Sequence, residues 1–150
     1  MMPSGCYYVG DLCYVLPDTV YGEEFLPGYC KENGAVVEGE WSLPSGAKIA
    51  VYSTAYGDGA YRDQLGRKYL VDAGLIGCIK VEDLKKMGVE DIPHGGHLVW
   101  FAQEFRTGYI EKNGVIVFGR VRIETDPDMD YSQYDEDEYG GTEEYHAAHY

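Results

Sequence analysis

Residues 109–118, Tyr-Ile-Glu-Lys-Asn-Gly-Val-Ile-Val-Phe, carry the pattern that decides the fold class. Asn113 and Gly114 both tolerate the positive φ angles that a tight two-residue turn requires, and apolar residues that favour strands lie on either side of them. The pattern predicts an antiparallel hairpin in a β-rich protein.

Short runs of aromatic and β-branched residues, separated by turns, continue this pattern along the chain. A Gly10-Asp11 step divides the first run, and residues 55–63 are so rich in glycine that we expect a bent loop or bulge there. The sequence predicts strands over residues 7–16, 48–54, 68–72, 74–80, 97–106, 108–112 and 115–118, with a last strand that ends at Ile123. Short strands at this regular spacing indicate a mostly β fold, either a compact antiparallel sandwich or a partly open barrel.

One short helix is predicted over residues 81–87. Acidic residues begin this segment, lysines end it, and Gly88 follows as a stop signal. Residues 20–25 favour at most a turn or two of helix, because Gly22 and Pro27 limit it.

The net charge of −14 is concentrated at the C-terminal end of the 150-residue chain. From Glu124 onward there are ten acidic residues and no Lys or Arg, which leaves 16 acidic against 12 basic residues, a charge of −4, for the part before it. Residues 126–150 also contain five tyrosines but no aliphatic periodicity. We therefore expect one β-rich domain over residues 1–125, followed by a disordered acidic, tyrosine-rich tail.

This charge distribution disfavours direct binding to nucleic acid or to an anionic membrane, and it favours a basic protein as the partner of the tail. The sequence has no apolar run long enough to span a bilayer and no cleavable leader pattern at its start. We expect a cytoplasmic protein, which for a viral protein means the host cytoplasm or the virion.

Asp11, Asp58 and Asp72 lie beside or close to glycine in otherwise apolar surroundings. A buried carboxylate must find hydrogen bonds or a cation, because leaving it unpaired is costly. If loops bring the three together, with Asp63 nearby, they are candidate catalytic residues that act as general acid and base or bind a divalent cation, the one cofactor suggested. In the alternative, each carboxylate caps its own turn through the backbone, as aspartates beside glycine often do.

The candidate ligand-binding residues are Tyr56, Tyr61, Asp63 and His97. His97 and His94 are three residues apart, and His146 and His149 repeat this spacing in the tail. A zinc site needs three or four protein ligands, and no cysteine lies near either pair in the sequence, so the metal ligands stay unassigned.

The four cysteines form no C-x-x-C pair and are expected to be reduced thiols. Cys13 follows the Gly10-Asp11 step and suggests a thiol nucleophile, with His97 as its base and Asp58 as the orienting group. Its apolar neighbours favour simple packing instead, because a catalytic thiolate needs a polar, electropositive site.

Residues 8–16, 55–61 and 71–74 carry a family resemblance. With their Gly-Asp-x-Cys-Tyr and Tyr-Gly-Asp-Gly motifs, they resemble an uncharacterised family of small bacterial, phage and large-virus proteins, in which the first motif is usually Gly-Asp-Pro-Cys-Tyr, so that Leu12 is a departure. The resemblance covers about the first half of the chain and the final strands. It implies that the three aspartates form a unit, and it implies no activity.

These observations favour a non-enzymatic protein-binding or regulatory module, encoded by a virus or phage if the resemblance holds. The acidic tail and the lack of a complete catalytic motif support this interpretation. One alternative is a small hydrolase that uses Asp11, Asp58 and Asp72, with or without a divalent cation. The other is a virion or scaffold component.

Overall fold

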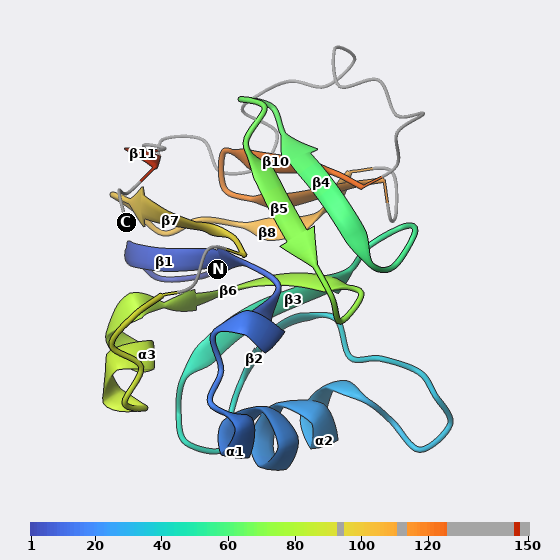
Figure 1. Cartoon of the computed structure of the whole chain (residues 1–150). Helices are drawn as coiled ribbons and strands as arrows, with labels where there is room; N and C mark the ends of the chain where they lie inside the picture. The colour runs from blue at the N-terminus through green and yellow to red at the C-terminus, as the bar shows by residue number, and fades with distance from the viewer. Residues whose placement is uncertain (93–94, 111–113, 126–145, 148–150) are drawn as a thin grey trace.

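The computed structural model describes residues 1–92, 95–110, 114–125 and 146–147, and it is mostly β (Figure 1). Two antiparallel sheets stack on each other, and neither closes into a barrel. The fold is an antiparallel sandwich, so the fold class expected from the sequence is confirmed.

The first sheet has the strand order β11-β7-β1-β6-β3-β2. Its central strand β1 pairs with both β6 and β7, and Tyr8 lies opposite Ile79 on one side and opposite Leu98 on the other. The strands are β1 (Gly5–Gly10), β2 (Gly39–Ser42), β3 (Lys48–Ser53), β6 (Leu75–Lys80), β7 (His97–Phe101) and β11 (His146–Ala147).

The second sheet has the strand order β5-β4-β10-β9-β8. The antiparallel pairing of β8 with β9 confirms the hairpin predicted over residues 109–118, although residues 111–113 lie outside the described part of the chain. The strands are β4 (Gly59–Asp63), β5 (Lys68–Val71), β8 (Thr107–Ile110), β9 (Val115–Phe118) and β10 (Val121–Glu124).

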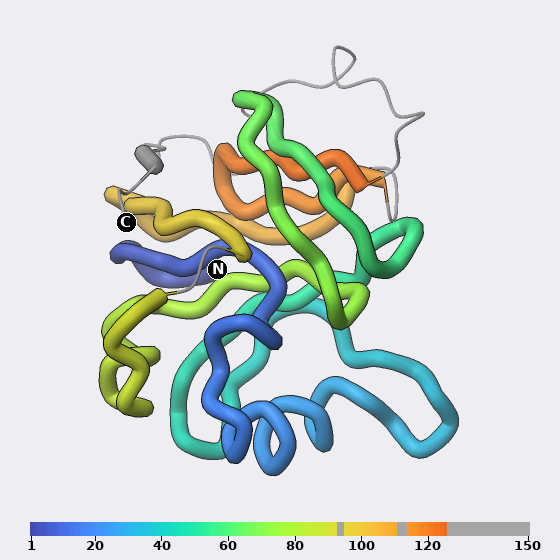
Figure 2. Tube along the Cα trace, viewed as in Figure 1, coloured from blue at the N-terminus to red at the C-terminus, as the bar shows by residue number. Residues whose placement is uncertain are grey.

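The first sheet is buried on both faces. Tyr7 and Val9 of β1 point toward the second sheet, where they join an apolar cluster that includes Ile116 and Phe118. Tyr8, between them in sequence, points the other way and packs in a second cluster with residues of the helices. The molecule therefore has three layers, with the second sheet above the first and the helices below it (Figure 2).

The helix predicted over residues 81–87 is confirmed as α3 (Val81–Lys86). The N-terminal helical segment is longer than the turn or two expected, and it comprises α1 (Asp18–Val20), a π-helical turn (Tyr21–Phe25) and α2 (Leu26–Tyr29). Phe25 is fully buried, and its ring stacks on Tyr29 and Trp41 with centroid distances of 5.1 and 5.9 Å. Burial of these rings outweighs the unfavourable glycine and proline.

Three local predictions are wrong. The strand expected over residues 7–16 stops at Gly10, because Asp11 caps a 3₁₀ turn that runs from Leu12 to Tyr14. The bent loop expected at residues 55–63 covers only residues 55–58, because residues 59–63 form strand β4, whose pairing with β5 and β10 overrides its glycine. The strand expected over residues 97–106 ends at Phe101.

The tail of residues 126–150, expected to be disordered, lies outside the described residues except for β11. This two-residue strand pairs with β7, and His146 lies opposite Trp100. None of the helices in the described ranges is long and apolar enough to cross a bilayer.

Candidate functional site

Asp11 is fully buried, and its carboxylate joins two loops that are far apart in the sequence. Oδ1 accepts a hydrogen bond from the backbone N–H of Cys13 at 2.9 Å. Oδ2 accepts from the backbone N–H groups of Asp72 at 2.8 Å and Ala73 at 2.7 Å. The carboxylate thus stabilises the end of β1 and the turn between β5 and β6, and any catalytic or metal-binding role would compete with these three donors.

Gly10 lets the chain turn into this loop. A Cβ atom at this position would lie 2.6 Å from the Tyr8 hydroxyl and 2.9 Å from the Cα atom of Gly96. Tyr8 in turn donates a hydrogen bond from its hydroxyl to the backbone carbonyl of Asp11 at 3.1 Å. At the Gly-Asp step, Gly10 therefore allows the backbone to pass close to Gly96 and Tyr8, and the buried carboxylate of Asp11 accepts hydrogen bonds from the backbone of both loops.

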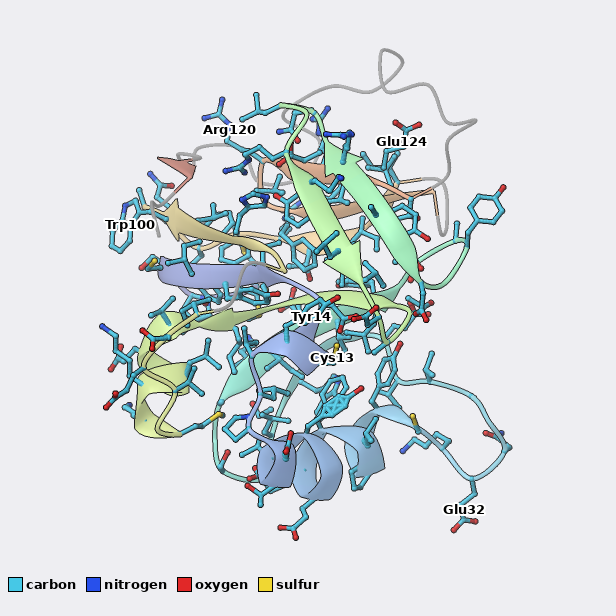
Figure 3. The ribbon with its side chains drawn as sticks, in the orientation of Figure 1. Cys13, Tyr14, Glu32, Trp100, Arg120 and Glu124 are labelled. Carbon is cyan, nitrogen blue, oxygen red and sulfur yellow. The ribbon has the colours of Figure 1, made fainter. Side chains whose placement is uncertain are left out.

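The other two candidate catalytic residues, Asp58 and Asp72, are exposed and lie in the same loop cluster, which Cys13 and Tyr14 mark in Figure 3. The Tyr14 hydroxyl donates to Asp72 Oδ2 at 2.6 Å. Asp58 is close enough for its charge, with that of Asp72, to act on Cys13. The structure therefore brings the three aspartates together, and only Asp11 is buried among them.

Cys13 is poorly suited to act as a nucleophile. Burial, a hydrogen bond with Asp11 and the nearby negative charges of Asp11, Asp72 and Asp58 raise the pKa of its thiol to about 12. The thiol is therefore protonated at neutral pH, whereas a nucleophile needs the thiolate. The structure also gives His97, its expected base, a different hydrogen bond.

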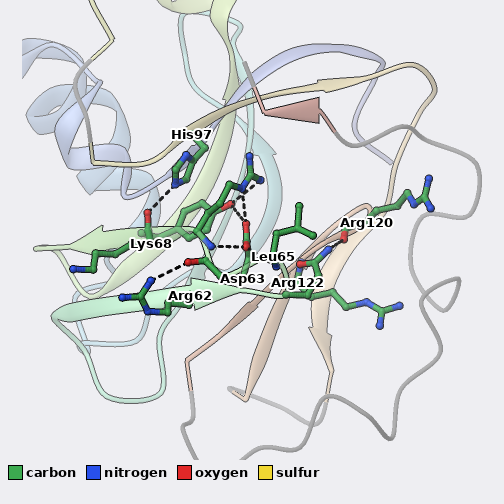
Figure 4. Close-up of polar contacts among 11 residues, drawn as sticks. Arg62, Asp63, Leu65, Lys68, His97, Arg120 and Arg122 are labelled. Atoms are coloured by element: carbon green, nitrogen blue, oxygen red, sulfur yellow. Dashed lines mark hydrogen bonds and ion pairs between the residues drawn. The ribbon is translucent and has the colours of Figure 1, made fainter. Parts of the chain in front are cut away.

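Asp63 is buried at the start of the β4–β5 turn, and its carboxylate is bonded within that turn (Figure 4). Oδ1 accepts from the backbone N–H groups of Leu65 at 2.9 Å and Arg67 at 3.0 Å. Oδ2 accepts from Arg67 Nε at 3.1 Å and from the Tyr69 hydroxyl at 2.8 Å. This candidate binding residue stabilises its own turn and lies apart from the turn of Asp72.

His97 connects the two sheets. Its Nε2 lies 2.8 Å from the backbone carbonyl of Lys68, to which it donates, and its ring packs edge-on against Tyr69 at 4.8 Å between centroids (Figure 4). Burial lowers the pKa of the imidazole, so the neutral form is favoured. His97 therefore links β7 to β5 through a neutral side chain.

Tyr56 and Tyr61, the other candidate binding residues, line one open pocket of about 330 Å³ together with Arg62 and Glu124. Tyr56 is 63% exposed, whereas Tyr61 donates its hydroxyl to the carbonyl of Gly57 at 2.8 Å. The pocket offers aromatic faces and charges of both signs. Asp63, predicted to bind ligand together with these tyrosines, does not line it, because its carboxylate is buried in the β4–β5 turn.

Sequence reasoning missed a larger groove, which lies between Trp100 of β7, one end of strands β1 and β6, and helix α3. Trp100 of β7 is 48% exposed, whereas its neighbours Val99 and Phe101 are fully buried. The groove has a volume of about 470 Å³ and is lined by Ser4, Gly5, Cys6, Lys80, Val81, Glu82, Lys85 and Trp100. The strand period of two places Trp100 on the face opposite Val99 and Phe101, but residues 98–101 are all apolar, so the sequence contains no sign that this face is exposed.

Within the described ranges, no group of three or more His, Cys, Asp or Glu side chains is placed to hold a metal ion. His94 lies outside those ranges, and the side chain of His146 is not described. The suggested divalent cation therefore stays without assigned ligands.

No family model, curated protein or solved structure matches the chain. The resemblance to the uncharacterised family thus depends on the motifs alone.

Proposed function

We propose that the protein is a non-enzymatic protein-binding module that takes an extended segment of its partner along the outer edge of β7. The observation that carries this proposal is the pairing of β11 with that edge. It supports the proposal because the edge has the geometry to add a strand, the mode by which several peptide-binding domains bind their ligands.

The groove that Trp100 of β7 forms with the ends of β1 and β6 and with α3 supplies side-chain contacts. Trp100 presents a large, half-exposed aromatic surface. Tryptophan is among the residue types that contribute most to binding energy at protein interfaces. Lys80 and Lys85 contribute positive charge on the same groove, opposed by Glu82, which also forms an exposed ion pair with Lys86 at 3.5 Å. The groove therefore favours an extended segment with acidic and aromatic residues.

The sequence around β11 has this composition. Glu143, Glu144 and Tyr145 directly precede the strand. A synthetic peptide of residues 143–150 is therefore a suitable probe for this edge of β7. To bind there, the peptide must displace β11, which belongs to the same chain and therefore competes at a high local concentration.

The experiment measures binding of this peptide to the full-length chain and to an Ala147→Pro variant. Proline lacks the N–H that a strand needs, so β11 should leave the edge, and the peptide should bind the variant about tenfold more tightly than the parent. A Ser132→Pro variant serves as the matched control and should bind like the parent. The fourth protein carries Trp100→Ala in addition to Ala147→Pro, and it should bind the peptide about tenfold more weakly than the Ala147→Pro variant. Equal binding to all four proteins would contradict the proposal.

The acidic tail provides a second contact in this proposal, to a basic surface of the partner. Its support is the charge distribution, with ten acidic and no basic residues from Glu124 onward. Deletion of residues 126–150 should abolish capture of a basic partner and leave the melting temperature nearly unchanged.

A small hydrolase is the second candidate, because the loops do bring Asp58 and Asp72 to one exposed cluster beside Asp11. In this hypothesis the two exposed carboxylates act on a substrate, and Tyr14 orients Asp72. Asp58→Asn should then abolish turnover in a broad hydrolase screen while the protein stays folded. A parent protein with no activity in that screen would remove the hypothesis.

A further inference from the structure

The groove between β7 and α3 has an aromatic wall. Trp100 projects from β7 near the end of the strand and is half-exposed (Figure 3). Its partner on the neighbouring strand β1 is Cys6, which also lines the groove. The free face of an indole is a surface on which a planar ring can stack. The groove volume of about 470 Å³ lies in the range of small-molecule binding sites.

Two lysines line the same groove, one from the end of β6 and one from α3. Lys80 ends β6, and its Cε atom would lie only 3.1 Å from a Cβ atom at position 5, so Gly5 leaves the space in which this side chain lies. Burial raises the pKa of the Cys6 thiol, and the charge of Lys85 in α3 opposes this effect. Both lysines therefore lie close to the first residues of β1.

The groove has an excess of positive charge. Glu82 is the acidic residue among its described lining residues, and this carboxylate pairs with Lys86 at 3.5 Å. Within the described ranges, the structure gives Lys80 and Lys85 no ion pair with a carboxylate. In a chain of net charge −14, two such lysines in one groove form a local site that suits a ligand with two negative charges.

A ligand that matches both features carries a planar ring and a phosphate monoester. Nucleic-acid bases stack on aromatic side chains, and this interaction tolerates any base because every base has a π face. A phosphate monoester carries about two negative charges at neutral pH, and lysine binds phosphate as a point charge. A nucleoside monophosphate joins a base and a phosphate through one sugar, so it presents both groups to the groove.

We propose that this groove is a binding site for a nucleoside monophosphate. The base stacks on the exposed face of Trp100, and the phosphate binds to Lys80 and Lys85. The groove also supplies side-chain contacts in the proposed function, so a bound nucleotide competes with the partner segment for Trp100. This competition rests on the proposed function, whereas the binding of the nucleotide does not.

Titration of the full-length chain with adenosine 5′-monophosphate tests the site. Trp100 and Trp41 are the two tryptophans of the chain, and Trp41 stacks on Phe25 in the helical layer. Stacking of adenine on Trp100 should quench the tryptophan fluorescence, with a dissociation constant on the order of 0.1 mM. The variant Trp41→Phe, in which Trp100 is the remaining tryptophan, should retain the quenching. Absence of saturable binding below about 1 mM would overturn the proposal.

Fragments of the nucleotide separate the two contacts without any change to the protein. Adenosine lacks the phosphate, and ribose 5-phosphate lacks the base. Each should bind the parent chain at least about tenfold more weakly than the nucleotide, because each loses one of the two contacts. A fragment that binds as tightly as the nucleotide would overturn the proposal, since the missing group would then contribute nothing.

Calorimetric titration compares the protein variants, because it does not depend on the fluorescence of Trp100. The variant Lys80→Gln with Lys85→Gln should bind the nucleotide at least about tenfold more weakly than the parent, and so should Trp100→Ala. The matched control, Lys31→Gln with Lys68→Gln, removes the same charge from exposed positions outside the groove and should bind like the parent. Equal binding by the groove and control variants would overturn the proposal. These titrations contain no peptide, so failure of the β7 peptide experiment leaves their result unaffected.

Discussion

Two buried aspartates occupy similar turns, but they connect very different parts of the chain. Asp11 accepts hydrogen bonds from backbone N–H groups 61 and 62 residues away, and it thereby fastens the end of β1 to the β5–β6 turn. Asp63 accepts from groups two, four and six residues away, within the hairpin of β4 and β5. A buried carboxylate can therefore stabilise a tertiary junction or a single turn, and its partners decide which.

The largest effect is expected at the tertiary junction. Asp11→Ala removes three charge-assisted hydrogen bonds and leaves backbone N–H groups of Cys13, Asp72 and Ala73 without their acceptor, so the free energy of unfolding should fall by about 3–5 kcal/mol. Urea unfolding measures this, with the exposed Asp18→Ala as control. A loss below about 1 kcal/mol would mean that Asp11 is not a structural residue.

A smaller loss is expected at the local turn. Asp63→Ala leaves the buried Tyr69 hydroxyl and the Arg67 side chain without their carboxylate, and about 2–4 kcal/mol should be lost. We expect the smaller loss because the β4–β5 turn involves neighbouring residues that can find a new backbone conformation, whereas the Asp11 junction joins two loops that are held in place by the rest of the fold. A double-mutant cycle with Arg67→Ala should give a coupling energy of about 1–2 kcal/mol. If Asp63→Ala costs more than Asp11→Ala, the distinction between the two junctions is wrong.

His97, which packs against strand β5 of the β4–β5 hairpin, should make the free energy of unfolding depend on pH. Burial, and secondarily the charge of Arg67, lower its pKa, while the Lys68 carbonyl and Asp63 oppose this shift. A lowered folded-state pKa means that the stabilisation is complete above the ordinary value of about 6.5 and is lost as the pH falls through the folded-state value. The free energy of unfolding should therefore decrease from pH 7 toward pH 5, and less so in His97→Gln. Parallel profiles for the two proteins would count against the packing of His97 on Tyr69.

The smallest effect on the free energy of unfolding is expected for the exposed hydrogen bond between Tyr14 and Asp72, at the surface of the Asp11 junction. Tyr14→Phe removes only the hydroxyl that bonds the exposed Asp72, and the loss in the free energy of unfolding should be below about 0.5 kcal/mol. Thermal unfolding measures this difference. A loss as large as that of Asp11→Ala would show that Asp72 belongs to the structural junction itself.

The sequence predicted the strands best where local pattern and tertiary pairing agree, as in the hairpin of β8 and β9 and in β3 and β6. It predicted poorly where packing overrides local preference. The helical segment through Gly22 and Pro27 is stabilised by the burial of Phe25, and β4 by its two neighbouring strands. For the candidate site, the sequence identified Asp11, Asp58 and Asp72 as a group and missed the exposed Trp100 and its groove.

The sequence by itself determined the β-rich class, the α3 helix and the acidic tail, because strand alternation, helix capping and charge composition are local properties. Only the tertiary structure decided what the aspartates do, that β11 pairs with β7, and that Gln64 bonds the backbone of Arg122. These features depend on groups that are distant in the chain, and such contacts follow from how the sheets pack, which the local pattern of residues does not specify.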